Sequence, residues 1–137
     1  MLFTAESQID IHEQSPLSLA FVGDAVLELL VRQRLVSTTR LQPGKLHATA
    51  VRYVSARAQS RELSLLEPLL TEEEANVFRR GKNASKATVA KHATPEEYRA
   101  STGLECLLGW LYLQKQNDRI VELFEVLWNG YDPDAKV

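Results

Sequence analysis

Two acidic residues, Asp24 and Glu105, stand in strongly apolar surroundings. Asp24 lies within AFVGDAVLELL and Glu105 within TGLECLLGWLYL. A carboxylate that leaves water must be paired, protonated or bound to a cation, because an isolated charge in a medium of low dielectric constant is costly. Small residues flank both acids and would let two helices approach closely, so the carboxylates could converge on one hard cation such as Mg²⁺. The chemistry that this pattern indicates is a metal-activated water attacking a phosphodiester.

A structural explanation of the same two acids stays open on this evidence. Each could pair with an Arg, Lys or His of a neighbouring helix, and His47 and His92 are available. Buried ion pairs are commoner than metal sites, and two carboxylates make a small ligand set. Glu28, one helical turn after Asp24, is either a third ligand or outer-sphere base, or an ordinary surface residue. Spacing alone does not separate these alternatives.

The elements that carry these acids are predicted to be helices. Apolar residues recur at helical spacing, and no segment alternates with the period of two that marks a half-buried strand. The first helix begins at Pro16, after Ser15, and continues through LSLAFVGDAVLELLVRQRLV. It is apolar on nearly all sides and is predicted to be central and buried on most faces. A second long helix is predicted from Lys45 to near Pro68, and the fold class is therefore all-α.

A third helix and a loop follow in the sequence. Thr71 and Glu74 form a capping-box pattern that opens TEEEANVFRRG, with an acidic first turn and a basic last turn. Gly81 is predicted to close this helix. The next segment, KNASKATVAKHAT, is polar, basic and rich in small residues, and we expect it to be an exposed loop.

The remaining part of the chain predicts two further helices. Thr94 and Glu97 repeat the capping pattern and open EEYRASTGLECLLGWLYLQKQ, which carries the second acidic residue. A fifth helix begins at Asn117 or Asp118 with one apolar stripe and ends near Gly130.

Length and composition limit the class of protein. The 137 residues, of which 45% are hydrophobic and 25% charged, predict one globular domain over residues 1–137 with its core at about 16–128. The single cysteine, Cys106, excludes an internal disulfide, and no Cys and His cluster has zinc-ligand spacing. The first residues carry acids but no Lys or Arg, unlike a signal peptide, and no apolar stretch is long enough to cross a bilayer. We therefore expect a cytoplasmic protein without a membrane anchor.

The charges are segregated along the chain although the net charge is only −2. No Asp or Glu occurs from Leu29 to Arg61 or from Ala75 to Pro95, and these two segments hold twelve of the sixteen cations. If the segments meet in space, they form a basic surface for nucleic acid on an otherwise acidic protein. The alternative is two solvated faces that serve only solubility.

The motifs resemble a known family. LSLAFVGDAVLELLVRQRL resembles the signature helix of the ribonuclease III catalytic domain, and YRASTGLECLLGWLYL resembles that family's second acidic helix. KLHATAVRYVSARAQ, RRGKNA and the lack of an appended double-stranded-RNA-binding domain are closer to the short Mini-ribonuclease III branch. The resemblance covers Pro16 to Trp128 and implies an all-α ribonuclease III endonuclease domain that forms a homodimer.

The resemblance also implies an active site. Asp24 and Glu105 match the two acids with which the family holds catalytic Mg²⁺. Ribonuclease III enzymes of full length carry two further acids, at the positions of Ala20 and Thr102 in this chain. The Mini-ribonuclease III branch is similarly reduced, but the departure leaves the number of metal ions undecided. Waters held by Thr102 or Ser101 would fill the missing ligand positions.

The activity that the resemblance implies is Mg²⁺-dependent cleavage of double-stranded RNA, leaving 5′-phosphates. The expected substrate is the stem of the 23S ribosomal RNA precursor, with a large-subunit ribosomal protein as a further candidate partner. The RNA is gripped through its phosphates and 2′-hydroxyls. The residues assigned to this grip are Arg79, Arg80, Lys82, Asn83, Lys86 and Lys91 on the loop and, on the second helix, Lys45, Arg52 and Arg57.

Two other function classes are kept beside this one. The first is a non-catalytic, ribosome-associated relative that binds structured RNA without cutting it. Retention of both Asp24 and Glu105 speaks against it, because a dead enzyme would be relieved of two costly charges by substitution. The second is a helical scaffold that only dimerises, which leaves the two acid-free basic segments unexplained.

Overall fold

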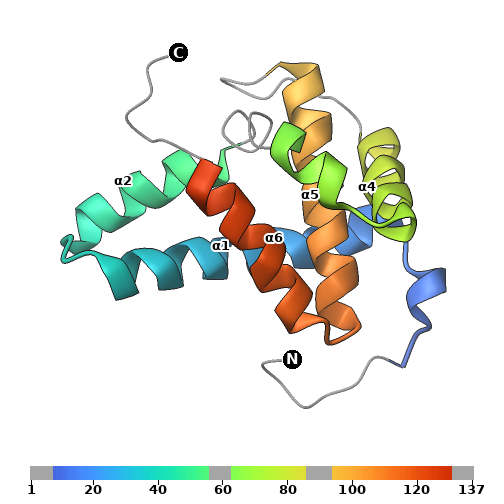
Figure 1. The fold of residues 1–137 in the computed structure, drawn as a ribbon, viewed down its shortest axis with the longest axis horizontal. Helices are drawn as coiled ribbons and strands as arrows, with labels where there is room; N and C mark the ends of the chain where they lie inside the picture. Colours follow the sequence, from blue (N-terminus) through green and yellow to red (C-terminus); the bar gives the residue numbers. More distant parts are fainter. Residues whose placement is uncertain (1–7, 56–62, 86–93, 131–137) are drawn as a thin grey trace.

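The computed structural model describes residues 8–55, 63–85 and 94–130, and within them it contains helices and no strand. The all-α prediction is confirmed (Figure 1). Two short 3-10 helices, η1 and η2, accompany the α-helices, and residues 63–66 are also helical. The elements are η1 (Ile11–Glu13), α1 (Pro16–Thr38), α2 (Pro43–Val54), η2 (Glu67–Leu69), α4 (Glu72–Ala84), α5 (Pro95–Leu113) and α6 (Asn117–Gly130).

The helix starts that the sequence predicts are confirmed at their caps. The Ser15 hydroxyl accepts a hydrogen bond of 3.1 Å from a first-turn backbone N–H of α1. Both capping boxes are complete: the side chains of Thr71 and Thr94 accept from the backbone N–H groups of Glu74 and Glu97, whose carboxylates accept in return. Each box satisfies two donors that the first turn of a helix otherwise leaves unpaired.

The prediction of one long second helix is wrong. The helix α2 ends at Val54, and Ser55 has an extended backbone with ψ of 148°. The end of α2 lies where Tyr53 stacks on Trp128 of α6, with ring centroids 4.4 Å apart and an interplanar angle of 8°. Hydrophobic spacing alone does not report this tertiary contact, and residues 56–62 lie outside the described part of the chain.

Gly81 does not close the third helix, as the sequence had suggested. The helix α4 continues through it to Ala84, because Gly81 is buried where α4 packs against α5. A Cβ atom at Gly81 would stand 2.5 Å from the Cβ of Cys106, so this glycine permits a close approach of two helices. The predicted loop therefore begins later, and its residues 86–93 lie outside the described residues.

The helix α5 forms the centre of the molecule. It packs against α1, α4 and α6 (Figure 1). Four of its leucines are completely buried: Leu104, Leu107, Leu108 and Leu111. No helix in the described ranges is long and apolar enough to cross a membrane.

The prediction that the first helix is buried on most faces is wrong for the single chain. Its buried residues form one stripe that faces α5 and α2, and they are Leu19, Ala20, Gly23, Leu27, Val31 and Leu35. On other faces apolar side chains are exposed, and Phe21 shows 83% of its surface. A monomer rarely exposes so many large apolar residues on one helix without a function for them.

Candidate active site

The crossing of α1 and α5 brings the two helix backbones into direct contact. A Cβ atom at Gly23 would stand 1.6 Å from the backbone oxygen of Glu105, and one at Gly109 would stand 1.9 Å from that of Leu19. Neither position can hold any other residue without moving a helix. The expectation that small residues let these helices approach closely is confirmed, and this contact determines where the two acids lie.

The carboxyl groups of Asp24 and Glu105 face each other across this crossing. Asp24 follows Gly23 on α1, and its side chain forms a hydrogen bond with that of Glu105. Burial raises the pKa of Glu105 to about 9, and the hydrogen bond and negative charge of Asp24 act in the same direction. In the described part of the chain neither acid forms an ion pair with a basic side chain. The two acids therefore contact each other instead of neighbouring cations.

The two acids differ in exposure, which corrects the sequence interpretation of Asp24. Asp24 is exposed in the single chain, whereas Glu105 is half-buried. Asp24 lines an open groove together with apolar neighbours such as Phe21 and Ala25, which are also exposed, so its carboxylate keeps contact with water. An exposed acid beside a half-buried one leaves the pair accessible to a ligand from solvent.

Glu28 lies close enough to influence the pair. Its negative charge contributes to the raised pKa of Glu105. Its carboxylate accepts a hydrogen bond of 3.1 Å from the Nε of Arg32, one turn further along α1. Glu28 is therefore neither an isolated surface residue nor a free ligand, because Arg32 holds it beside the site.

The positions where the resemblance implies two missing acids are occupied by buried small residues. Ala20 and Thr102 are 8% and 7% exposed. The Thr102 hydroxyl lies 3.1 Å from the backbone oxygen of Tyr98 and 3.2 Å from the Oγ of Ser85. Its hydroxyl is therefore already hydrogen-bonded to two groups within the protein. Ser101, the other residue expected to hold a water, is also buried.

Comparison with known proteins agrees with this geometry. The family model of the ribonuclease III domain matches residues 17–116, which include both carboxylates and the helix crossing. The chain belongs to the ribonuclease III domain family. RNA cleavage is the activity that this family indicates.

Several relatives are similar over most of their length. The chain is 47% identical over 110 residues to Mini-ribonuclease 3 of Symbiobacterium thermophilum, covering 80% of this chain and 85% of the relative. It is 36% identical over 128 residues to Mini-ribonuclease 3 of Clostridium tetani, covering 93% and 85%. A crystal structure of a protein from Fusobacterium nucleatum superposes with a TM-score of 0.79 at 30% identity, covering 88% of this chain and 97% of that one. The resemblance that the motifs predicted is confirmed.

The basic residues of this ribonuclease III domain lie in two separate places. Arg79, Arg80, Lys82 and Asn83 belong to the last turns of α4, whereas Lys45 and Arg52 belong to α2. Figure 1 shows α2 and α4 at opposite ends of α1. The described cations of α2 and α4 are therefore far apart within one chain, and whether the remaining parts of the two acid-free segments meet lies outside the described residues. Lys86, Lys91 and Arg57, as well as His92, lie outside the described residues.

Several of these cations already have partners. Lys82 forms an ion pair of 2.9 Å with Glu96, and the hydrogen bond from Lys82 holds the pKa of Glu96 below its usual value. Arg79 donates to the side chain of Asn76. Arg34, one of the cations of the acid-free segment, pairs with Glu125. It also lies over the rings of Phe124 and Trp128, which makes it part of the packing between α1 and α6.

Cys106 is a packing residue in this domain. It is 1% exposed and lies against Gly81 at the contact of α4 and α5. Burial raises the pKa of its thiol to about 11, which keeps the reactive thiolate form rare at neutral pH.

Sequence reasoning missed an apolar groove beside Asp24. The groove measures about 700 Å³ and combines one face of α1 with parts of α5 and α6. It is lined by Phe21, Ala25, Leu29, Tyr112, Ile120 and Val121, among others. The sequence does contain a signal for this groove, because a helix that is apolar on all sides needs a packing partner on more than one of its faces.

Proposed function

We propose that the protein is a Mg²⁺-dependent endoribonuclease that cleaves double-stranded RNA, with Asp24 and Glu105 as its metal ligands. The observation that carries this proposal is the contact of the two carboxyl groups at the crossing of α1 and α5. The fold brings two acids together with no basic partner among the described residues, an arrangement that costs free energy unless a cation or a proton joins them.

The donor set fits a hard divalent cation. Within residues 8–55, 63–85 and 94–130, no three or more His, Cys, Asp or Glu side chains are grouped so that they could hold a metal ion. The proposed site therefore offers only two carboxylates. Mg²⁺ is commonly held by only one or two carboxylates, because it keeps several waters and also binds substrate phosphates. The raised pKa of Glu105 supports the fit, since a cation between the carboxyls would take the place of the proton. When bound, the cation supplies positive charge to a phosphodiester and lowers the pKa of a water.

The residues of the chain supply position and charge. Gly23 and Gly109 hold the two helices at contact distance and so set where the carboxyls stand. Asp24 is exposed to solvent and can meet a phosphate of the substrate, while Glu105 lies half-buried beside it. Glu28, held by Arg32, adds a negative charge near the pair and can orient a water.

We assign the grip on RNA to the exposed cations. A-form RNA is bound mainly through phosphates and 2′-hydroxyls, which suits Arg and Lys on helix ends. Arg79, Arg80 and Asn83 are exposed on the last turns of α4, and Lys82 beside them is shared with Glu96. The complete proposed set adds Lys45, Arg52, Arg57, Lys86 and Lys91.

We also propose that a second copy of the chain covers the apolar groove beside Asp24. Exposed Phe21 and the groove lie on the same helix, so one surface offers both a projecting side chain and a hollow. Such a self-complementary surface suits a homodimer with two-fold symmetry. Dimerisation would place two carboxylate pairs on one assembly, one for each strand of an RNA duplex, and would bring basic ends of two chains toward one duplex.

The natural substrate that the family resemblance supports is the stem of the 23S ribosomal RNA precursor. A large-subunit ribosomal protein that presents this stem would be a partner in the cytoplasm. Cleavage of the naked precursor can be compared with cleavage of the precursor bound to ribosomal proteins, and faster cutting of the bound form would identify this partner role.

The first experiment measures cleavage of a labelled RNA duplex by the wild type and by Glu105→Gln, each with Mg²⁺ and with chelator. We expect cutting only by the wild type with Mg²⁺, and products that carry 5′-phosphates. Binding of the duplex by both proteins without cutting by either would instead favour a non-catalytic RNA-binding protein. Equal cutting by the variant would overturn the metal-ligand assignment.

A further inference from the structure

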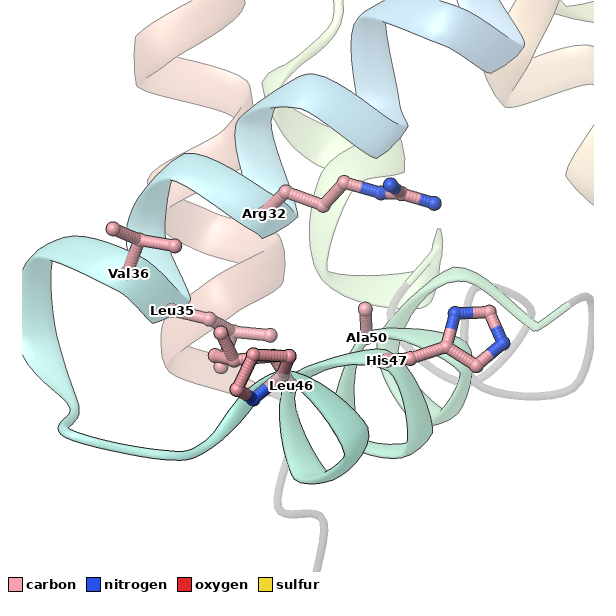
Figure 2. A pocket seen from close by; sticks show the side chains of 7 residues that line it. Arg32, Leu35, Val36, Leu46, His47 and Ala50 are labelled. Atoms are coloured by element: carbon pink, nitrogen blue, oxygen red, sulfur yellow. The ribbon is translucent and has the colours of Figure 1, made fainter.

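A second hollow lies between the end of α1 and the start of α2, and it shares no lining residue with the groove beside Asp24. It measures about 240 Å³ (Figure 2). Its apolar lining consists of Leu35, Val36, Pro43, Leu46 and Ala50. Small-molecule sites are commonly about 300–1,000 Å³, so this pocket is better suited to one apolar side chain.

Two polar residues complete the pocket at one end. Figure 2 shows the side chains of Arg32 and His47 extending toward the same end of the pocket, away from Val36. Both lie on the surface, so a ligand could reach them from solvent. The guanidinium of Arg32 has more donors than its single described bond to Glu28 uses.

The surroundings of the pocket are basic. From residue 29 to residue 55 the chain contains no Asp or Glu, and this stretch forms the pocket's two walls. The cations at the surface there include Arg40 and Lys45, as well as Arg32, which is shared with Glu28 just before this stretch. Charge complementarity therefore favours an anionic partner.

The apolar floor decides between two kinds of anionic partner. RNA offers phosphates and riboses to a surface but no aliphatic side chain to fill an apolar pocket. Val36 is 65% exposed at the rim, and a bound apolar group would remove it from water. An acidic polypeptide offers both the carboxylates for the rim and an apolar side chain for the floor.

We propose that this pocket is a docking site for an acidic segment of another protein, which inserts one apolar side chain between α1 and α2. Carboxylates next to the inserted side chain pair with Arg32 and His47. The pocket shares neither Asp24 nor Glu105 with the proposed metal site, and Arg32 is its one lining residue that also pairs with Glu28 beside that site.

The test is direct binding of short, fluorescein-labelled peptides of Glu and Asp with a central Leu or Phe, measured by fluorescence polarisation. A peptide with a central Ala is the matched control. We expect the Leu or Phe peptide to bind about tenfold more tightly than the Ala peptide, because the apolar side chain is buried only in the former. If neither the Leu peptide nor the Phe peptide binds more tightly than the Ala peptide, the docking site is disproved.

Two protein variants locate the binding. Val36→Asp places a negative charge at the rim, whereas Val51→Asp makes the same change at an exposed position of α2 that does not line the pocket. We expect Val36→Asp to weaken peptide binding at least about tenfold and Val51→Asp to leave it unchanged within about twofold. Equal effects of both variants would overturn the proposal. The proposal would also be overturned if Val36→Asp bound the peptides normally but had lost its binding of duplex RNA or changed its oligomeric state.

Discussion

Gly23 of α1 lies directly against the backbone carbonyl of Glu105 in α5, so the residue before one acid touches the backbone of the other. The contact is between the two helix backbones, and no flexible side chain lies at the point of contact. Gly109 repeats it one turn along α5, against Leu19. The geometry of the carboxylate pair is therefore set by helix packing.

Replacement of Gly23 is expected to destabilise the fold. In Gly23→Ala the new methyl group cannot be accommodated without separating α1 from α5, and we expect a loss of about 3 kcal/mol or more in the free energy of unfolding. Gly44→Ala is the matched control, because a Cβ atom there meets nothing within 4 Å. That variant should stay within about 1 kcal/mol of the wild type in urea unfolding. Similar losses in both would contradict the packing argument.

The stability of the metal-free protein should depend on Glu105. Its pKa is about 9 in the folded chain and near the ordinary 4.5 in the unfolded chain, so between these values the folded state holds more protons. The free energy of unfolding then falls as the pH rises through this interval, with a slope of up to about 1.4 kcal/mol per pH unit. Glu105→Gln removes the titrating group and should flatten the profile.

Urea unfolding across this pH range, with chelator and then with Mg²⁺, measures that effect. Mg²⁺ should restore stability to the wild type at alkaline pH but not to Glu105→Gln. Glu73→Gln changes an exposed acid on the first turn of α4 and is the control. Parallel profiles for the wild type and Glu105→Gln would show that the carboxyl pair is not coupled to folding.

The ion pair of Glu74 with Arg119 ties α4 to α6. Glu74 is 4% exposed, and Arg119 donates to its two oxygens at 2.8 and 2.9 Å. The hydrogen bond from Arg119 lowers the pKa of Glu74, so the stabilisation is present above pH 4.5 and is lost as the pH falls. We expect Glu74→Gln to cost about 3 kcal/mol at neutral pH, because it leaves a partly buried guanidinium without its main partner.

Glu122→Gln provides the comparison for that variant. Glu122 also pairs with Arg119, at 2.9 Å, but its side chain is 66% exposed. Exposed pairs contribute about 1 kcal/mol or less. In thermal unfolding at neutral pH, the midpoint temperature of Glu74→Gln should lie far below that of Glu122→Gln. The reverse order would refute the assignment.

Phe21 should control the oligomeric state. Phe21→Ser removes the most exposed large apolar side chain of the described residues, at the edge of the groove beside Asp24. We expect sedimentation velocity to show a shift from dimer to monomer without loss of helical content. Leu69→Ser, at an exposed position of η2, should leave the dimer intact. A wild type that sediments as a monomer would remove the basis of the dimer proposal.

Glu96 should weaken RNA binding in the wild type. Its ion pair with Lys82 neutralises a cation at the end of α4, so Glu96→Gln frees that cation for phosphate. We expect duplex RNA to bind roughly twofold or more tightly to this variant, with a steeper dependence on salt. Glu72→Gln makes the same change in net charge at the other end of α4 and should have a smaller effect. Filter binding at several salt concentrations would show equal effects if only net charge matters.

The local part of the fold was predictable because its signals are local. Ser15, Thr71 and Thr94 begin their helices as expected, since an N-cap needs only its own first turn. The contact of Asp24 with Glu105 was also anticipated, from the small residues beside each acid. Its decisive residue, Gly23, could be recognised because a glycine inside an apolar helix suggests close packing.

The errors arose where tertiary contacts decide the outcome. Gly81 looked like a helix end, but it lies inside α4 because Cys106 packs against it. The helix α2 ends one residue after Tyr53, which stacks on Trp128, a residue far away in the sequence. Asp24 is exposed although its neighbours are apolar, because burial follows the position on the helix and not the composition of the segment.

The crossing of α1 and α5 has a consequence for cation size. Because the backbones at Gly23 and Gly109 touch, the frame of the site has no slack, and the span between the two carboxyl groups depends on side-chain length. Asp24→Glu would lengthen one arm by a methylene while the frame stays fixed. Mg²⁺ binds oxygen at about 2.0–2.1 Å and Ca²⁺ at about 2.3–2.6 Å. In the proposed metal site, the length of the acid at position 24 would therefore tune which divalent ion fits between the two carboxyl groups.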